Sequence, residues 1–116
     1  MSEQLSYDEI TQKFFELHGN EETQQAAYDL ITKEAPRFPE ERLRRDNWRY
    51  CAAALLNKPD LAIEIMQESL DAGFWMSKEY LRSDEDLKIL QDLPAFNQIV
   101  EECDQKHQAA VSSSHF

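Results

Sequence analysis

The fold is decided by residues 61–100, which read LAIEIMQESLDAGFWMSKEYLRSDEDLKILQDLPAFNQIV. The stretch opens with an amphipathic helix whose apolar and small residues recur at helical spacing, and Gly73 is expected to close that helix as its C′ residue. Ser83 or Asp84 can cap a short helix that follows, and Pro94 suits the first turn of another. The stretch therefore predicts a succession of helices with short connections.

The rest of the chain carries start and stop signals of the same kind. Ser6 and Glu9 form a capping box, and Gly19 is expected in the left-handed conformation at the end of that helix. Asn20 is an N-cap, Pro36 stops the second helix, and Pro39 suits the first turn of the third. A third helix is expected to run to about Leu56, with an apolar face broad enough in its second half to pack on two sides. No segment is a candidate strand.

These signals predict an all-α fold of antiparallel helix pairs, joined by short connectors and closed by a C-terminal capping helix. Residues 1–106 are expected to form a single domain, because the length of the chain suits one modest core. Residues 107–116 lose the helical periodicity and end in serines, so a flexible tail is expected there.

The net charge of −11 restricts the partners of this protein. An acidic surface repels phosphates, so neither nucleic acid nor an anionic membrane is expected as a partner. The charge is uneven, because residues 60–104 contain 12 acidic and three basic residues, whereas five of the six arginines lie between Arg37 and Arg49. Two solvated helix faces would explain this distribution without a binding role.

Two cysteines, Cys51 and Cys103, lie in apolar helical patterns without a Cys-x-x-Cys or a metal-binding spacing. Two buried free thiols in a reducing compartment are expected, and a disulfide is the alternative. The N-terminal sequence MSEQLSYDE lacks the apolar region of a signal peptide, and the longest apolar run, Tyr50–Leu56, is too short to cross a bilayer. The protein is therefore expected to be cytoplasmic.

One helix pair resembles a tetratricopeptide repeat. The second helix of that repeat places a small residue, an apolar residue four positions on and a small residue three beyond, as Ala62, Met66 and Ser69 do here. The preceding helix, with Trp48 and Ala52, resembles the first helix of the repeat. The resemblance implies a short right-handed array with a concave groove lined by the third helix, and flanking helices must complete its core.

A second resemblance continues beyond this pair. The segment GFWMSKEYLRSDEDLKILQDLPAFNQIVEEC is similar to one found after tetratricopeptide-like helices in bacterial proteins, some of which carry a C-terminal α/β-hydrolase domain. The Gly-Phe-Trp, Leu-Arg-x-Asp-x-Asp-Leu and Leu-Pro-x-Phe positions carry the similarity, which covers about residues 48–103. The sequence ends where such a hydrolase would begin and has no Gly-x-Ser-x-Gly elbow, so that chemistry is not expected here.

The sequence predicts no catalytic, cofactor or metal site. Residues 83–86, Ser-Asp-Glu-Asp, lack the glycine and the distal glutamate of a calcium loop, and helix capping explains them. The three histidines, His18, His107 and His115, are scattered along the chain and expected at the surface. Cys51 has apolar neighbours in its helix, which favours a buried thiol over a nucleophile.

The first binding candidates are Arg42, Arg45 and Arg49, whose spacing places them on one face of the third helix, while Arg44 falls on another. In a tetratricopeptide-like groove these three arginines could clamp a carboxylate or an acidic peptide by bidentate hydrogen bonds. Pairing with the protein's own acids, such as Glu41 with Arg45, is the alternative.

An aromatic cluster is the second binding candidate. Trp48, Phe74 and Trp75 can anchor a partner, as exposed aromatic residues do at interfaces, or they can be core that seals the helix pair. Trp75 is expected to be the most exposed of the three. A homodimer through the region of Phe74 and Trp75 is also open.

These features favour a non-enzymatic protein–protein interaction module, an adaptor or scaffold, that binds an acidic or carboxy-terminal protein segment in a helical groove. An accessory or regulatory domain that works with a separate α/β-hydrolase is the first alternative, and a small enzyme is the second. No cofactor is expected. The protein is expected to be a monomer or a weak homodimer.

Overall fold

The structure of the protein is a computed structural model that describes residues 5–113. Helices and turns account for the regular structure of this part of the chain, which contains no strand, so the predicted all-α fold is confirmed. The α-helices are α1 (Tyr7–His18), α2 (Gln24–Glu34), α3 (Arg42–Leu55), α4 (Pro59–Asp71), α5 (Lys78–Ser83) and α6 (Pro94–Ser113). The 3₁₀ turns are η1 (Glu21–Thr23), η2 (Ala35–Arg37), η3 (Pro39–Glu41) and η4 (Glu85–Leu90).

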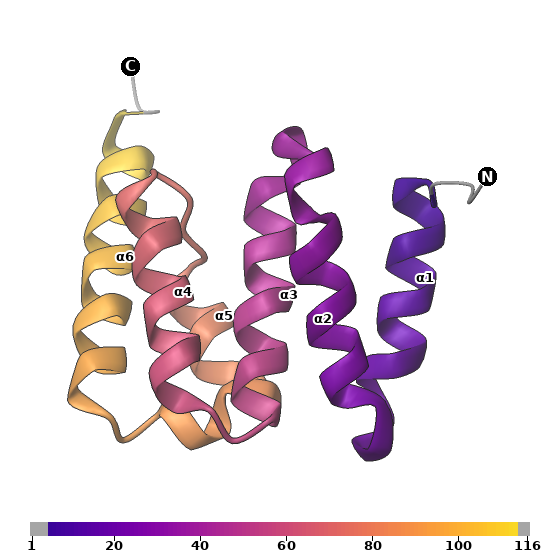
Figure 1. The fold of residues 1–116 in the computed structure, drawn as a ribbon. Coiled ribbons are helices and arrows are strands. Elements are labelled where there is room, and N and C mark those ends of the chain that lie inside the picture. Colours follow the sequence, from indigo (N-terminus) through magenta and orange to yellow (C-terminus); the bar gives the residue numbers. More distant parts are fainter. Residues whose placement is uncertain (1–4, 114–116) are drawn as a thin grey trace.

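Successive helices stand side by side, from α1 at one end of the molecule to α6 at the other (Figure 1). Short links, such as residues 56–58 between α3 and α4, make the successive helices α1 to α4 alternate in direction, whereas α6 runs in the same direction as its neighbour α4 (Figure 1). The short α5 and η4 lie behind this row, with η4 packed on α3 and α5 on α6. The tetratricopeptide-like, right-handed character of the array stays a prediction.

No helix within residues 5–113 combines the length and the apolar composition that crossing a membrane requires.

Two hydrophobic clusters form the core, and both use α3. The smaller cluster packs α1 and α2 against one side of α3 and contains Ile10, Phe14, Ala27, Ile31, Trp48 and Ala52. The larger cluster packs α4, α5, η4 and α6 against the other side. Ala52, Ala53 and Ala54 are almost completely buried, and their small side chains let helices approach α3 from both sides. The predicted two-sided packing of this helix is confirmed.

Most of the predicted starts and stops are confirmed. The amide of Glu9 donates to Ser6 Oγ (3.2 Å), and the amide of Ser6 donates to Glu9 Oε1 (3.0 Å), which completes the capping box. Asn20 Oδ1 accepts from the amide of Glu22. Gly73 has a φ of +94°, and the amide of Phe74 behind it donates to Ser69 O (2.9 Å), as in a Schellman motif.

One helix end differs from the prediction, and another has a conformation that was not predicted. Gly19 has a φ of −74°, so the expected left-handed conformation is wrong; the chain instead becomes extended at Asn20, which caps η1. Helix α3 ends where predicted, but the left-handed conformation there was not expected: Asn57 takes a φ of +59° and closes a second Schellman motif. Asparagine tolerates this region better than other residues with a side chain.

The C-terminal helix is longer than the sequence suggests. Regular helix continues through the first part of the predicted tail and ends at Ser113, while residues 114–116, with His115, lie outside the described residues. Ala109 and Ala110 are strong helix formers, so the helix persists beyond the point where its apolar face stops.

The two glycines provide a matched test of the backbone conformations at the ends of α1 and α4. We expect Gly73→Ala to lower the free energy of unfolding by about 1–2 kcal/mol, because an alanine at positive φ is strained even where space is open. Gly19→Ala should leave stability unchanged or raise it by up to about 1 kcal/mol, since its Cβ would make only an ordinary contact with Phe15 O. Urea unfolding measures both, and equal losses would contradict the assignment of the two conformations.

Candidate functional site

Two cavities of about 330 and 140 Å³ lie along α3 and share Asn47 as a lining residue; we call them together the α3 groove. The first cavity is lined by η3, α3 and the link after α4, with the residues Glu40, Glu41, Leu43, Arg44, Asn47, Phe74 and Met76. The second is lined by Phe14, Phe15, His18, Asn47, Trp48, Cys51, Tyr80, Asp84 and Asp86.

Exposed apolar side chains gather on this groove. Phe15 is 51% exposed, Leu43 40% and Tyr80 36%. Leu43 lines the first cavity, and Phe15 and Tyr80 line the second. Large apolar residues that stand in water beside a cavity are typical of a binding surface. None of the three stands out in the sequence, because each belongs to the helical pattern that also fills the core.

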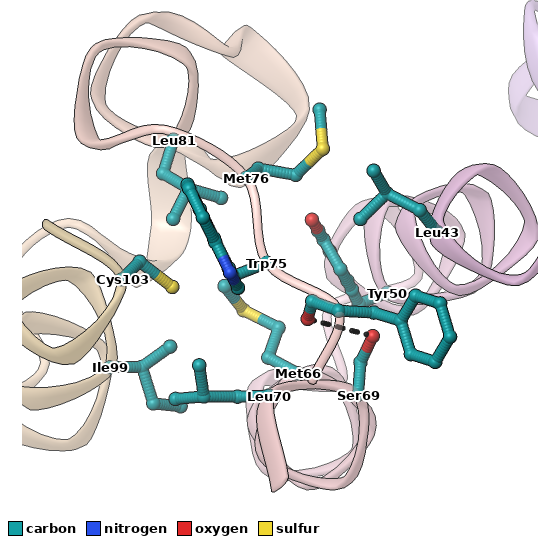
Figure 2. A pocket seen from close by; sticks show the side chains of 11 residues that line it. Leu43, Tyr50, Met66, Ser69, Leu70, Trp75, Met76, Leu81, Ile99 and Cys103 are labelled. Atoms are coloured by element: carbon teal, nitrogen blue, oxygen red, sulfur yellow. Dashed lines mark hydrogen bonds between the residues drawn. The ribbon is translucent and has the colours of Figure 1, made fainter. Parts of the chain in front are cut away.

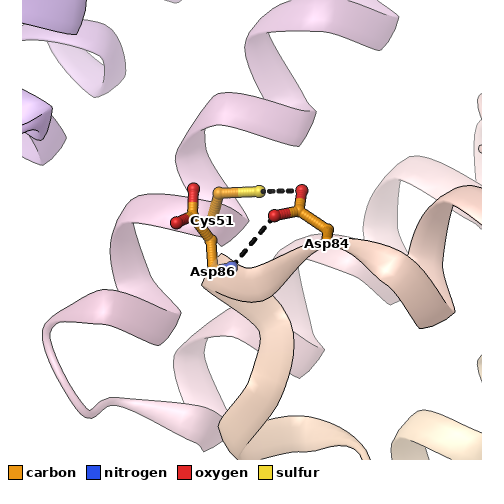
Figure 3. Close-up of side chains that lie close together, drawn as sticks. All are labelled: Cys51, Asp84 and Asp86. Atoms are coloured by element: carbon orange, nitrogen blue, oxygen red, sulfur yellow. Dashed lines mark hydrogen bonds between the residues drawn. The ribbon is translucent and has the colours of Figure 1, made fainter.

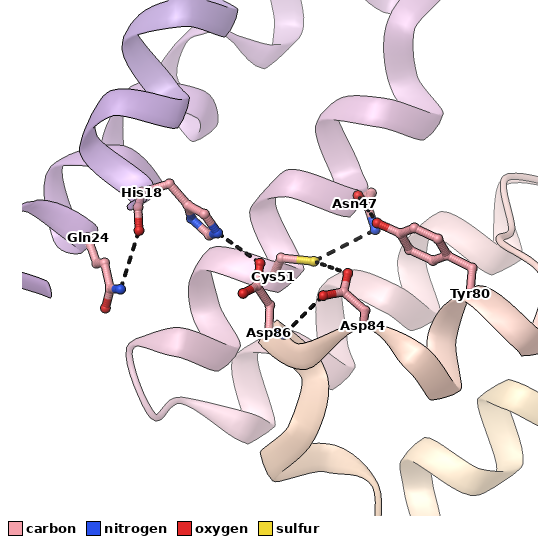
Figure 4. Close-up of polar contacts among 7 residues, drawn as sticks. All are labelled: His18, Gln24, Asn47, Cys51, Tyr80, Asp84 and Asp86. Atoms are coloured by element: carbon pink, nitrogen blue, oxygen red, sulfur yellow. Dashed lines mark hydrogen bonds and ion pairs between the residues drawn. The ribbon is translucent and has the colours of Figure 1, made fainter. Parts of the chain in front are cut away.

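The floor of the groove is a buried polar network around Asn47 (Figure 4). The Asn47 amide nitrogen donates to the Tyr50 hydroxyl (2.9 Å), and its oxygen accepts from the Tyr80 hydroxyl (3.1 Å). The thiol of Cys51 donates to Asp84 Oδ2 (3.5 Å). Every hydrogen bond of this set joins α3 to itself or to α5 and the start of η4, so the network fixes the position of Tyr80 at the rim.

The inner end of the groove carries a histidine–aspartate contact. His18 Nε2 lies 2.9 Å from Asp86 Oδ2, and the His18 side chain is only 12% exposed, so the expected surface position of this histidine is wrong. His18 Nδ1 is shielded from water and has no hydrogen-bond partner in the described part of the chain. Asp84 accepts from the amide of Asp86 (2.9 Å), which confirms its predicted capping role.

The environment of Cys51 argues against a nucleophile. Burial raises the pKa of the Cys51 thiol far above its ordinary value, and the negative charges of Asp84 and Asp86 raise it further. The thiol therefore stays protonated at neutral pH, whereas nucleophilic attack requires the thiolate. Burial likewise raises the pKa of the Cys103 thiol, and both cysteines are buried and free, as predicted.

The three candidate arginines lie outside the α3 groove. Arg42, Arg45 and Arg49 line a separate cavity of about 280 Å³ on the side of α3 that faces α2, together with Thr32, Ala35, Pro36 and Asp46. Arg44, which the helical spacing places on another face, is the arginine that lines the groove.

The arginine cavity keeps unsatisfied donors. Arg42 Nε lies 3.1 Å from Asp46 Oδ2, and Arg49 Nη1 lies 3.8 Å from Asp46 Oδ1, so one buried carboxylate serves two guanidinium groups. Nε and Nη1 of Arg45 are shielded from water without a hydrogen-bond partner among residues 5–113. The cavity therefore has an excess of positive charge in a protein of net charge −11.

The tryptophans take structural positions. Trp48 is 8% exposed and stacks on Phe14, with ring centroids 5.3 Å apart, inside the smaller core cluster. Trp75 is half-buried and, with Cys103, lines a cavity of only about 10 Å³ (Figure 2). Its ring also meets the His107 ring edge-on, with centroids 5.7 Å apart. Both side chains seal helix contacts, and Trp48 also supports the floor of the groove.

The network on the groove floor predicts a specific stability loss. We expect Asn47→Ala to cost about 1–3 kcal/mol of the free energy of unfolding, because the deeply buried Tyr50 hydroxyl loses its hydrogen-bond donor. Tyr80→Phe should cost less, about 0.5–1.5 kcal/mol, because Tyr80 is 36% exposed whereas Tyr50 is buried. Chemical unfolding followed by circular dichroism measures both values; an Asn47→Ala loss no larger than that of Tyr80→Phe would rule out a structural role for the network.

Comparison with known proteins places the chain in a family. Residues 6–111 match the family described as A/B hydrolase-like, N-terminal domain. The crystal structure of an uncharacterized protein from Bacillus cereus superposes with a TM-score of 0.83 at 25% sequence identity, over 97% of this chain and 36% of that one. The chain thus spans about a third of the length of that protein. No curated protein matches the sequence significantly. Since the family match covers nearly all of the sequence, the chain belongs to the A/B hydrolase-like, N-terminal domain family.

Proposed function

We propose that this chain is a non-catalytic helical domain that binds a protein partner, and that the partner is an α/β-hydrolase catalytic domain. The observation that carries the proposal is membership of the A/B hydrolase-like, N-terminal domain family over residues 6–111. The similar protein from Bacillus cereus supports it, because most of that chain lies outside the region that superposes on the helical domain.

The α3 groove is the docking surface in this proposal. Its rim presents Phe15, Leu43 and Tyr80 to solvent, and burying such side chains against a partner supplies most of the energy of association. Polar groups of Arg44 and Glu41 flank the first cavity and can orient the partner. A rigid helical scaffold with apolar anchors and a polar edge suits recognition of a folded domain or a protein segment.

The arginine cavity gives the partner a second anchor. Arg42 belongs to this cavity, and its guanidinium also lies 5.3 Å from the centre of the Phe74 ring, which lines the groove. A partner in the groove can therefore extend an acidic side chain or a terminal carboxylate toward Arg42 and Arg45. The unsatisfied N–H groups of Arg45 are the donors that such a carboxylate would satisfy if the guanidinium turned toward it.

The proposal assigns no chemistry to the chain itself. The groups in the α3 groove are a protonated thiol, two tyrosines held neutral and a paired histidine, which together form no nucleophile and base. Two buried free cysteines agree with a reducing environment, which supports a cytoplasmic location.

Affinity purification from the native cell, with mass spectrometry, tests the groove. The wild-type chain should recover a protein whose sequence contains an α/β-hydrolase domain with a Gly-x-Ser-x-Gly elbow. Leu43→Asp should reduce that recovery by roughly tenfold or more, because a charge would replace an apolar anchor. Ile89→Asp is the matched control, since Ile89 is 45% exposed but lines neither cavity, and it should leave recovery unchanged.

The arginine anchor has its own variants. Arg45→Glu and Arg49→Glu should weaken recovery of the same hydrolase if its acidic group enters the cavity, and unchanged recovery would remove the anchor while leaving the groove in place. Recovery of no hydrolase by the wild-type chain, or equal recovery by Leu43→Asp and Ile89→Asp, would overturn the proposed function.

A further inference from the structure

Four side chains of the types that bind transition metals meet at the inner end of the α3 groove. His18 comes from the last turn of α1, Cys51 from α3, Asp84 from the end of α5 and Asp86 from η4. All four line the same cavity of about 140 Å³. Their side chains point toward one another from three directions (Figure 4).

We propose that His18, Cys51, Asp84 and Asp86 bind one divalent transition-metal ion of the zinc type. This proposal goes beyond the proposed protein-binding function and does not depend on the identity of the partner. We call these four residues the four-donor cluster. The sequence predicts no such site, because the four donors lie far apart along the chain. His18 is 33 positions before Cys51, and Cys51 is 33 positions before Asp84.

Three of the four donors are arranged much as in a bound site. Donor atoms of Cys51, Asp84 and Asp86 all lie within 4.8 Å of one another (Figure 3). Sulfur and oxygen ligands at usual zinc distances and a tetrahedral angle are about 3.5 Å apart, and Cys51 Sγ lies 3.5 Å from Asp84 Oδ2. His18 Nε2 is already 2.9 Å from Asp86 Oδ2. His18 lies outside the set of three donors that are mutually within 4.8 Å, so its ring would have to turn toward Cys51 and Asp84 to complete a shell of four.

The charge of the cavity favours a cation. Two carboxylates face each other here, and among the described residues neither a lysine nor an arginine lines the cavity. His18 is the single group there that can carry a positive charge, and it contacts Asp86 alone of the two acids. A divalent ion would neutralise both carboxylates beside the apolar side chains of Phe14 and Trp48, which lower the local dielectric constant and strengthen the attraction.

The donor set selects the kind of metal. One sulfur, one imidazole nitrogen and two carboxylate oxygens suit zinc or a similar borderline ion better than calcium or magnesium, which take oxygen ligands. Binding displaces the thiol proton of Cys51 to solvent, and the Nε2 proton of His18 leaves to solvent from the imidazolium or moves to Nδ1 in the neutral ring. Four protein ligands fill a tetrahedral shell, which is the arrangement of a structural site.

A metal at this position would connect the two halves of the fold. His18 belongs to the helix pair of the smaller core cluster, whereas Asp84 and Asp86 belong to the part packed in the larger one, and Cys51 lies on α3 between them. The ion would therefore fix α1 relative to η4 and hold the inner end of the groove in one shape.

Titration of the full chain with Zn²⁺ and Co²⁺ tests the site. We expect one saturable zinc ion per chain by calorimetry, a thiolate-to-cobalt charge-transfer band, and a higher melting temperature with zinc. Cys51→Ser should abolish the cobalt band and weaken zinc binding at least by the roughly 10- to 100-fold that loss of a supporting residue causes. Cys103→Ser is the matched control, because that thiol is also buried but outside the cluster, and it should bind as the wild type does.

Asp86→Asn keeps the test decisive if Cys51→Ser does not fold, since the Asp86 side chain is 34% exposed and its replacement is nearly isosteric. This variant should retain the helical circular dichroism spectrum and lose the zinc-dependent rise in melting temperature. Absence of one-to-one binding by the wild type, or zinc binding by Cys51→Ser and Asp86→Asn equal to that of Cys103→Ser, would overturn the proposal.

Discussion

Burial of α3 on both of its sides is the constraint on which the rest of the structure depends. A helix that packs against two layers needs small residues where backbones approach, and the run Ala52–Ala54 supplies them. Because α1 and α2 cover one side and α4, η4 and α6 cover the other, neither cluster would be closed without this helix. The order of the remaining helices follows from the short links that attach them to it.

The same burial explains why polar groups of α3 form the groove. A helix in the middle of two clusters cannot direct every side chain to apolar neighbours, and Asp46, Asn47 and Cys51 are buried with it. Buried polar atoms require partners. Asp46 therefore draws two arginines to one side of the helix, and Asn47 and Cys51 draw Tyr80 and Asp84 to the other. The two cavities of interest lie beside these two sets of contacts.

The backbone conformation at a helix end was predictable where a few adjacent residues determine it. It was not predictable where the start of the following element determines it. The capping box at Ser6 and the C′ role of Gly73 are properties of a few adjacent residues, so the sequence predicts them well. Gly19 differs because Asn20 becomes extended to cap the following turn, and that choice overrides the freedom of glycine. Helical spacing placed Arg42, Arg45 and Arg49 on one face, yet it could not say that this face turns toward α2 and away from the groove.

The sequence by itself determined the all-α class, the positions of most helix boundaries, the burial of both thiols and the resemblance to helical regions that accompany α/β-hydrolases, because all of these depend on periodicity, caps and short motifs. Only the tertiary structure decided which side chains share a cavity. His18 reaches Asp86 across 68 positions, and Phe15 and Leu43 reach one groove, because packing brings distant helices together. The spacing of residues along the chain predicts which side chains share one face of a helix. It does not predict which helices pack together, and those contacts form the site.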